Sequence, residues 1–300
     1  MAAGKYRFET VACLLIALLA AVFYFWSTIQ PAEQWAFREA DGYYNLLTAG
    51  FRSGHLYASI QPAPELLALS DPYDPVANAP YRVHDMSLFN GHYYLYYGVT
   101  PVFLFFWPLA FITGRYVLEP VAVAFFCTGA IWTGMGLLVA IRRRHFPAAS
   151  PWALILGSLC LAFATPLNRL VEAPQFYQVP ISCAIFLQAL MLLAIYFSLH
   201  SSRRNTWLVV SGLIFGLSVG ARPNHLLEAA VLLIPLAWFA RIGNPDKAER
   251  KVRFNRLAKI TLVPVAAIGA LLMLYNWERF GSIARASSPE RISIFTPRLR

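Results

Sequence analysis

The chain has 300 residues, of which 58% are hydrophobic and only 13% are charged, and its mean hydropathy is +0.51. Soluble globular domains usually contain about 25% charged residues, so this composition excludes a soluble domain and indicates a polytopic membrane protein. The formal charge of +10 does not indicate nucleic-acid binding, because the basic residues cluster in short runs between apolar segments, as they do in cytoplasmic loops.

The first apolar segment, residues 11–29, is long enough to cross the roughly 30 Å hydrocarbon core of a bilayer. It follows Lys5 and Arg7 and ends in aromatic residues, which is typical of the belt at a membrane surface. The alternative, a cleaved signal peptide, normally has a shorter apolar region that ends in small residues. We therefore predict an N-terminal span over residues 1–29, uncleaved, with the N-terminus in the cytoplasm.

Residues 30–116 are predicted to form a large loop on the outer side of the membrane, with interfacial helices. The part from residue 30 to 99 holds seven of the 15 acidic residues and nine of the 15 tyrosines. Ionisable groups inside the hydrocarbon core cost several kcal/mol, so a membrane protein is expected to keep its chemistry in such a loop.

Residues 100–114 are apolar but are interrupted by Pro108, and as a helix they reach only about 22 Å. If this segment crossed the membrane, the basic runs at 142–144 and 241–259 would both lie on the outer side. That placement breaks the positive-inside rule twice. We therefore predict an interfacial or re-entrant helix here.

Six further spans are predicted between residues 117 and 275, which gives an all-α membrane protein with about seven transmembrane helices. They are expected at 117–141, 152–167, 180–199, 207–220, 226–239 and 260–274. An outer loop is expected at 168–179 and a basic cytoplasmic loop at 241–259. The outer tail, residues 276–300, loses its apolar character after residue 282, so we expect a disordered end and a truncated gene product.

The start of the large loop contains two carboxylates, Glu39 and Asp41, before the pair Tyr43-Tyr44 and a short amphipathic segment. A carboxylate at this place has two interpretations. It caps a surface helix, where the helix dipole favours its ionised form, or it acts as a general base that deprotonates an acceptor hydroxyl. Residue types alone leave both open.

The rest of the loop holds two turn signals and one weak metal candidate. Asp71-Pro72-Tyr73-Asp74-Pro75 is typical of a rigid turn, and Asn90-Gly91 predicts a hairpin between two aromatic-rich strands. Asp85 with His84 or His92 offers ligands for a divalent cation, but the spacing matches no metal signature, so no metal or other cofactor is predicted. The tyrosines after the turn, Tyr94 among them, suit either sugar stacking or a membrane interface.

Near the end of the fifth predicted span lies Gly220-Ala221-Arg222-Pro223-Asn224-His225. An arginine at the end of a span often extends to the interface to stay hydrated. A planar guanidinium in a broken helix also suits bidentate binding of a phosphate. Both interpretations of Arg222 stay open.

The order of these features resembles the C-type membrane glycosyltransferases, in particular the branch of protein O-mannosyltransferases and the lipid A aminoarabinose transferase. Glu39-Ala40-Asp41-Gly42-Tyr43 through Gly54 matches the acidic pair, tyrosine and glycine of their first loop loosely, since the two carboxylates are not adjacent. The resemblance covers residues 1 to about 282, and family members usually continue with more spans and an outer domain.

The resemblance implies transfer of a sugar from a polyprenyl-phosphate carrier to a glycan, lipid or protein acceptor on the outer face of a bacterial cytoplasmic membrane. Asp41, or Glu39, is then the catalytic base. The implied substrate-binding residues are Asp85, Tyr43, Tyr44, Tyr94, Arg222 and Asn224. The alternatives are a transporter or flippase of a lipid-linked or polar substrate, for which Glu228 is the best intramembrane candidate, and a non-catalytic remnant that binds the lipid carrier.

Overall fold

The computed structural model describes residues 2–28, 36–37 and 40–283. The protein is an all-α polytopic membrane protein, which confirms the predicted fold class. Its contacts divide the chain into two compact units. The helical unit comprises Met1–Trp35 and Glu119–Gly269, and the loop unit comprises Ala36–Leu118 and Ala270–Arg300.

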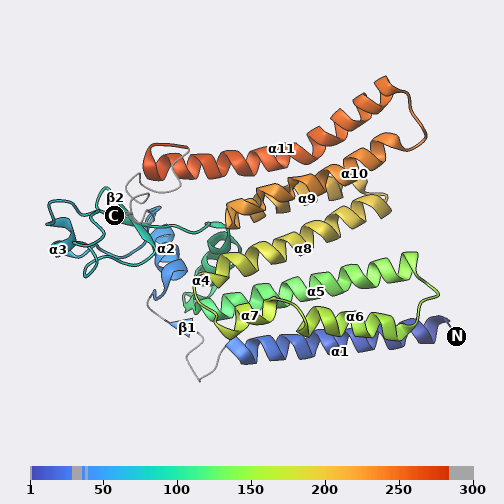
Figure 1. The fold of residues 1–300 in the computed structure, drawn as a ribbon, viewed down its shortest axis with the longest axis horizontal. Helices are drawn as coiled ribbons and strands as arrows, with labels where there is room; N and C mark the ends of the chain where they lie inside the picture. Colours follow the sequence, from blue (N-terminus) through green and yellow to red (C-terminus); the bar gives the residue numbers. More distant parts are fainter. Residues whose placement is uncertain (1, 29–35, 38–39, 284–300) are drawn as a thin grey trace, which may run out of the picture. The chain divides into compact units, whose positions relative to one another are not determined.

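The helical unit is a bundle of long helices whose directions alternate along the chain (Figure 1). They are α1 (Ala2–Thr28), α5 (Glu119–His145), α6 (Pro151–Phe163), α7 (Leu167–Glu172), α8 (Gln178–His200), α9 (Arg204–Ala221), α10 (Ala229–Arg241) and most of α11 (Lys247–Phe280). The 3₁₀ segment η2 (Pro223–Glu228) joins α9 to α10. Each predicted span corresponds to a helix of this bundle.

Six helical segments are long and apolar enough to cross a membrane. They are Tyr6–Thr28, Glu119–His145, Pro151–Glu172, Gln178–His200, Pro223–Arg241 and Lys247–Phe280. The fifth predicted span, α9, has 18 residues but is not among the six, because it opens on the polar residues Arg204 and Asn205. It packs closely on α11: a Cβ added to Gly212 would lie 2.2 Å from the carbonyl oxygen of Thr261.

Helices extend into three of the segments predicted as loops or tail. The outer loop expected at 168–179 begins with α7, the basic loop expected at 241–259 is helical from Lys247, and α11 continues to Phe280. The physical reason is that hydropathy marks only the apolar part of a helix. Polar turns continue α11 beyond that part, with an ion pair between Glu249 and Arg253 one turn apart.

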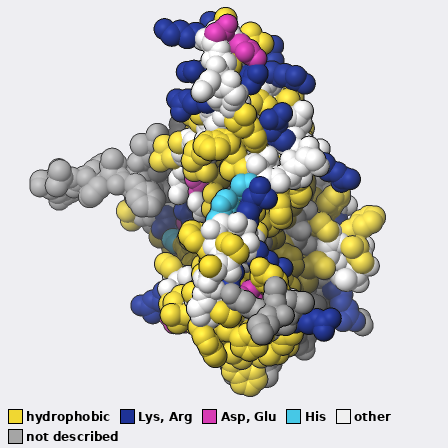
Figure 2. Space-filling model, turned by 90° about the vertical axis from the view of Figure 1, so that its right-hand side faces the viewer, with side chains coloured by type: hydrophobic (Ala, Val, Ile, Leu, Met, Phe, Trp, Pro, Cys, Tyr) yellow, Lys and Arg dark blue, Asp and Glu magenta, His cyan; other side chains and the backbone are white. Residues whose placement is uncertain are grey.

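The basic runs of the sequence lie together at one end of the helical unit. There Arg143 of α5 donates from Nη2 to Thr10 Oγ1 of α1 at 2.7 Å. Nε2 of His145 lies 3.3 Å from Nε2 of His200 in α8. Figure 2 faces this end and shows Lys and Arg side chains spread across it. The predicted segregation of these runs to one side is therefore present in the bundle.

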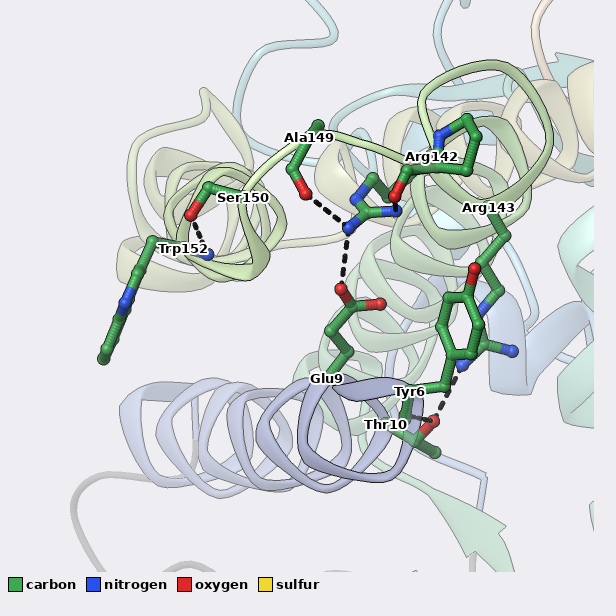
Figure 3. A network of polar contacts seen from close by, with 9 residues as sticks. Tyr6, Glu9, Thr10, Arg142, Arg143, Ala149, Ser150 and Trp152 are labelled. Carbon is green, nitrogen blue, oxygen red and sulfur yellow. Dashed lines mark hydrogen bonds and ion pairs between the residues drawn. The ribbon is translucent and has the colours of Figure 1, made fainter. Parts of the chain in front are cut away.

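A buried ion pair also joins helices at this end (Figure 3). Nη2 of Arg142 lies 2.8 Å from Oε1 of Glu9, and the two side chains are 5% and 0% exposed. The same guanidinium donates to the carbonyl oxygens of Ala149 at 2.7 Å and Pro147 at 3.3 Å. Arg142 thereby ties α1, α5 and the α5–α6 turn together.

The loop unit is built from short elements. Its helices are α2 (Tyr43–Arg52), α3 (Pro64–Leu67), the π-helical segment η1 (Val102–Phe106), α4 (Trp107–Thr113) and the last turns of α11. Strand β1 (Ala36–Phe37) pairs antiparallel with β4 (Tyr116–Val117), and β2 (Met86–Phe89) pairs antiparallel with β3 (His92–Leu95). Ala58, Leu66, Met86 and Tyr93 form its apolar core.

Both turn predictions for the loop unit are confirmed. Asn90 and Gly91 have φ values of 47° and 74°, and these positive values at both central positions suit a tight hairpin turn. Asp71 and Asp74 each accept a hydrogen bond at 2.9 Å from the backbone nitrogen two residues ahead. These two carboxylates therefore shape the turn around the Asp–Pro steps.

Residues 102–113 are helical, as predicted, and too short to be counted with the six long apolar segments. The π-helical segment η1 precedes Pro108 of α4. Proline lacks a backbone N–H and its ring disturbs the preceding turn, which gives a reason for the altered hydrogen-bond spacing.

Candidate functional site

Asp41 lies directly before α2, and its side chain is exposed. Its Oδ1 accepts a hydrogen bond from the backbone nitrogen of Gly42 at 2.8 Å. The backbone around it is held by Asn45, whose Nδ2 donates to the carbonyl oxygens of Asp41 at 2.7 Å and Val117 at 2.9 Å. Within the described part of the chain no cation pairs with this carboxylate. Hydrogen bonds therefore hold the backbone at Asp41 in place, and its carboxylate is accessible to a ligand.

The capping interpretation does not hold for Asp41. The N-cap of α2 is Gly42, with φ 80° and ψ 160°, and no side chain caps this helix end. Asp41 stands one position further out, near the positive end of the helix dipole. Glu39, the other candidate base, lies outside the described residues.

The two tyrosines that open α2 face the interior of the loop unit. Tyr44 is fully buried and stacks on Phe106, with ring centres 5.3 Å apart and an interplanar angle of 12°. Tyr43 is half-buried and packs against the core around Tyr93. Tyr44 therefore packs in the interior of the loop unit, while Tyr43 keeps part of its surface exposed.

Asp85 and Tyr94 belong to the hairpin of β2 and β3. Asp85 precedes β2 with a φ of 55°, unusual for a residue other than glycine, and its Oδ2 lies 3.2 Å from Nε2 of His84. Tyr94 is only 7% exposed, and burial raises the pKa of its hydroxyl above the usual 10.0. The nearby Arg279 guanidinium opposes that rise.

Arg279 is the residue of this unit that sequence reasoning missed. It lies in the last turn of α11, is 8% exposed and donates from Nη2 to the carbonyl oxygen of Leu95 at 2.9 Å. Its guanidinium lies 5.2 Å from the ring centre of Tyr94. One signal was available: Arg279 lies within a few residues of the end of the last apolar run, where a buried cation is costly unless it has a role.

The two remaining predicted site residues belong to the helical unit. Arg222 follows α9 with extended backbone and is half-buried, and its guanidinium forms no ion pair with a carboxylate of the described residues. Asn224 is exposed in η2. In the same segment Nδ1 of His225 lies 2.6 Å from Oε1 of Glu228, with side chains 13% and 18% exposed. The break between α9 and α10 therefore gathers several ionisable groups.

Among the described residues, no group of three or more His, Cys, Asp or Glu side chains is placed to hold a metal ion. No family model, curated protein or solved structure matches this chain. The local chemistry of the two units is therefore the basis on which a function can be inferred.

Proposed function

We propose that this chain is a membrane glycosyltransferase that moves a sugar from a polyprenyl-phosphate donor to an acceptor hydroxyl. The observation that carries the proposal is the Asp41 carboxylate: exposed, without an ion-pair partner in the described chain, and mounted on a backbone fixed by Asn45. An exposed carboxylate on a rigid backbone, in a polar unit of a membrane protein, suits a general base that acts at the membrane surface.

In the proposed reaction Asp41 takes the proton of the acceptor hydroxyl, and that oxygen attacks the anomeric carbon of the donor sugar. The bond between this carbon and the phosphate oxygen breaks, the configuration inverts, and the polyprenyl phosphate leaves with the bonding electrons. Negative charge grows on the phosphate in the transition state, so a cationic ligand stabilises that state more than the ground state. In the helical unit, Arg222, with Asn224 beside it in sequence, is a separate candidate for binding a phosphate.

We further propose that the basic end of the helical unit faces the cytoplasm of a bacterial cell. The positive-inside rule supports this orientation, since the Lys and Arg runs lie together at that end (Figure 2). The N-terminus is then cytoplasmic, the membrane is the cytoplasmic membrane, and transfer takes place on its outer face. Reporter fusions at His145 and His55 test this: accessibility of both tags from one side contradicts the proposed topology.

Release of labelled sugar from a panel of polyprenyl-phosphate sugars tests the proposed reaction. Asp41→Asn keeps an oxygen that accepts from Gly42 but removes the base, so we expect turnover to fall by about 100-fold or more. The matched control is Asp71→Asn. Its amide oxygen can still accept the hydrogen bond from the backbone nitrogen of Tyr73, so the turn is preserved, and we expect its turnover to stay within about twofold of wild type. Loss of turnover in the control alone, or in neither variant, contradicts the role of Asp41.

One observation favours a second candidate, a transporter of a polar substrate. The His225–Glu228 pair lies within the apolar segment Pro223–Arg241, and ionisable pairs at such places often mark substrate or proton paths. Proteoliposomes with an imposed pH gradient test it. Substrate uptake that stops in Glu228→Gln supports transport. Sugar release that is the same in Asp41→Asn and wild type means that Asp41 is not the base of a transfer reaction.

A further inference from the structure

Arg279 has few partners for a buried cation. A guanidinium carries several N–H donors, yet Arg279 makes a single hydrogen bond in the described chain, from Nη2 to the carbonyl oxygen of Leu95 at 2.9 Å. Its Nε is buried without a hydrogen-bond partner among the described residues, as is Nε of the other buried arginine, Arg142. Within the described part of the chain it forms no ion pair with a carboxylate. The side chain is nevertheless only 8% exposed.

Aromatic rings surround this guanidinium. Its central carbon lies 4.5 Å from the ring centre of Phe280, 4.6 Å from that of Tyr275 and 5.2 Å from that of Tyr94. Phe280 in turn packs on Tyr94, with ring centres 5.1 Å apart. The rings attract the cation through their faces, but they do not accept its remaining N–H groups in hydrogen bonds of normal strength. Two of the three rings add a phenol hydroxyl, which is a further donor.

The other buried arginine, Arg142, shows what a purely structural guanidinium receives. It is 5% exposed, pairs with Glu9 at 2.8 Å, and donates to two backbone carbonyl oxygens. A buried cation normally needs such compensation, because it loses its hydration shell. Arg279 has comparable burial but no anion among the described residues, and this missing anion is what distinguishes it from Arg142.

We propose that Arg279, together with the hydroxyl groups of Tyr94 and Tyr275, forms a binding site for a phosphate group. The guanidinium supplies the positive charge and a planar donor edge that matches phosphate oxygens. The tetrahedral oxygens of a phosphate can accept from the guanidinium and from phenols that lie out of its plane, and a phosphate can carry a second negative charge that a carboxylate cannot. The phenyl ring of Phe280 gives the site an apolar wall for the organic part of a phosphate ester.

The proposal goes beyond the transfer reaction and does not depend on it. Phosphate groups occur in free phosphate and in lipid headgroups, and the structure supports the chemistry common to both. Binding can therefore be measured without turnover, and failure of the sugar-release assay leaves this proposal untouched.

Calorimetric titration of the detergent-solubilised full chain tests the site with two probes, inorganic phosphate and short-chain phosphatidic acid. We expect wild type to bind, and Arg279→Gln to bind at least about tenfold more weakly, since a charge-assisted hydrogen bond is lost. Tyr94→Phe and Tyr275→Phe keep the rings and remove one hydroxyl each, so we expect a weakening of about two- to tenfold.

The matched control is Arg52→Gln. Arg52 belongs to the same unit and lies 5.6 Å from the ring centre of Tyr116, but it is exposed. We expect its affinity for both probes to stay within about twofold of wild type. Binding of inorganic phosphate indicates a site for the free ion, and binding of phosphatidic acid alone indicates a lipid headgroup; either supports the proposal.

Two results would overturn the proposal: wild type that binds neither probe, or Arg279→Gln that binds both as wild type does. If Arg279→Gln does not fold, the two Tyr→Phe variants decide. Unchanged affinity in both of them means that the phenol hydroxyls are not ligands, and the site as proposed is then wrong.

Discussion

The two units of this protein each bury an arginine, and they compensate its charge in opposite ways. In the helical unit Arg142 has a carboxylate partner, Glu9, and two backbone carbonyl oxygens. In the loop unit Arg279 has one carbonyl oxygen and three aromatic rings. Nε lacks a partner in both guanidiniums, so the difference lies in the anion: Arg142 has one, and Arg279 has none among the described residues. A paired charge indicates a structural role, whereas an unpaired one is left for a ligand.

The same contrast applies to the carboxylates. Glu9 is fully buried and paired, while Asp41 is exposed and has no ion-pair partner among the described residues. The helical unit thus uses its buried charges to join helices, whereas the loop unit holds groups whose partners are not provided by the described chain. We therefore place the transfer chemistry in the loop unit.

The largest effect is expected from Glu9→Gln, which puts Arg142 in the situation of Arg279. Removal of one partner from a buried pair leaves an uncompensated charge and typically costs about 3–5 kcal/mol of stability. Thermal unfolding of the purified chain measures this loss. A change below about 1 kcal/mol means that the pair does not stabilise the bundle.

A smaller loss is expected from Arg279→Gln in the absence of phosphate. The variant loses contacts with aromatic rings and one hydrogen bond to a backbone carbonyl, worth about 1–3 kcal/mol together. The same unfolding measurement compares it directly with Glu9→Gln. A loss as large as that of Glu9→Gln contradicts the incomplete compensation that we infer for Arg279.

The stability of the loop unit should decrease at high pH. Burial raises the folded-state pKa of Tyr94 above 10.0, so between pH 10.0 and that higher value the unfolded chain gives up the proton and the folded chain keeps it. The stabilisation is complete below pH 10 and is lost as the pH rises through the folded-state pKa. Unfolding measured from pH 9 to 12 gives the slope of the unfolding free energy against pH, and we expect Tyr94→Phe to reduce this slope. An equal slope in wild type and Tyr94→Phe excludes Tyr94 as its source.

The smallest effect is expected when both partners of the buried pair are replaced together. Glu9→Leu combined with Arg142→Met removes the two charges and fills the space with apolar side chains, and such exchanges are often neutral or stabilising. We expect the stability to stay within about 1 kcal/mol of wild type. A loss close to that of Glu9→Gln indicates that the hydrogen bonds of Arg142 to Pro147 and Ala149 matter more than the charge pair.

Local signals in the sequence predicted local structure. Asn90-Gly91 predicted the hairpin, and the Asp–Pro steps at Asp71 and Asp74 predicted the turn, because these residue types favour those backbone conformations directly. Hydropathy located the long helices but not their ends, since polar turns such as the start of α11 at Lys247 continue past the apolar part.

Contacts between distant residues were not predictable in this way. Glu9 and Arg142 are 133 residues apart in the chain, and Arg279 and Leu95 are 184 apart. Nothing in the residue types near Glu9 or Arg279 indicates which partner, if any, each one meets. The sequence also did not predict the burial of Tyr44 against Phe106, because a tyrosine in an amphipathic helix occurs on the buried face as well as on the exposed face.

The most direct test of this account is the release of labelled sugar from polyprenyl-phosphate donors by three proteins: wild type, Asp41→Asn, and Glu9→Leu with Arg142→Met. We predict that Asp41→Asn folds and loses turnover, while the double variant keeps it, because the chemistry belongs to the loop unit and the buried pair is structural. Turnover that persists in Asp41→Asn, or that disappears in a folded double variant, contradicts this division of roles.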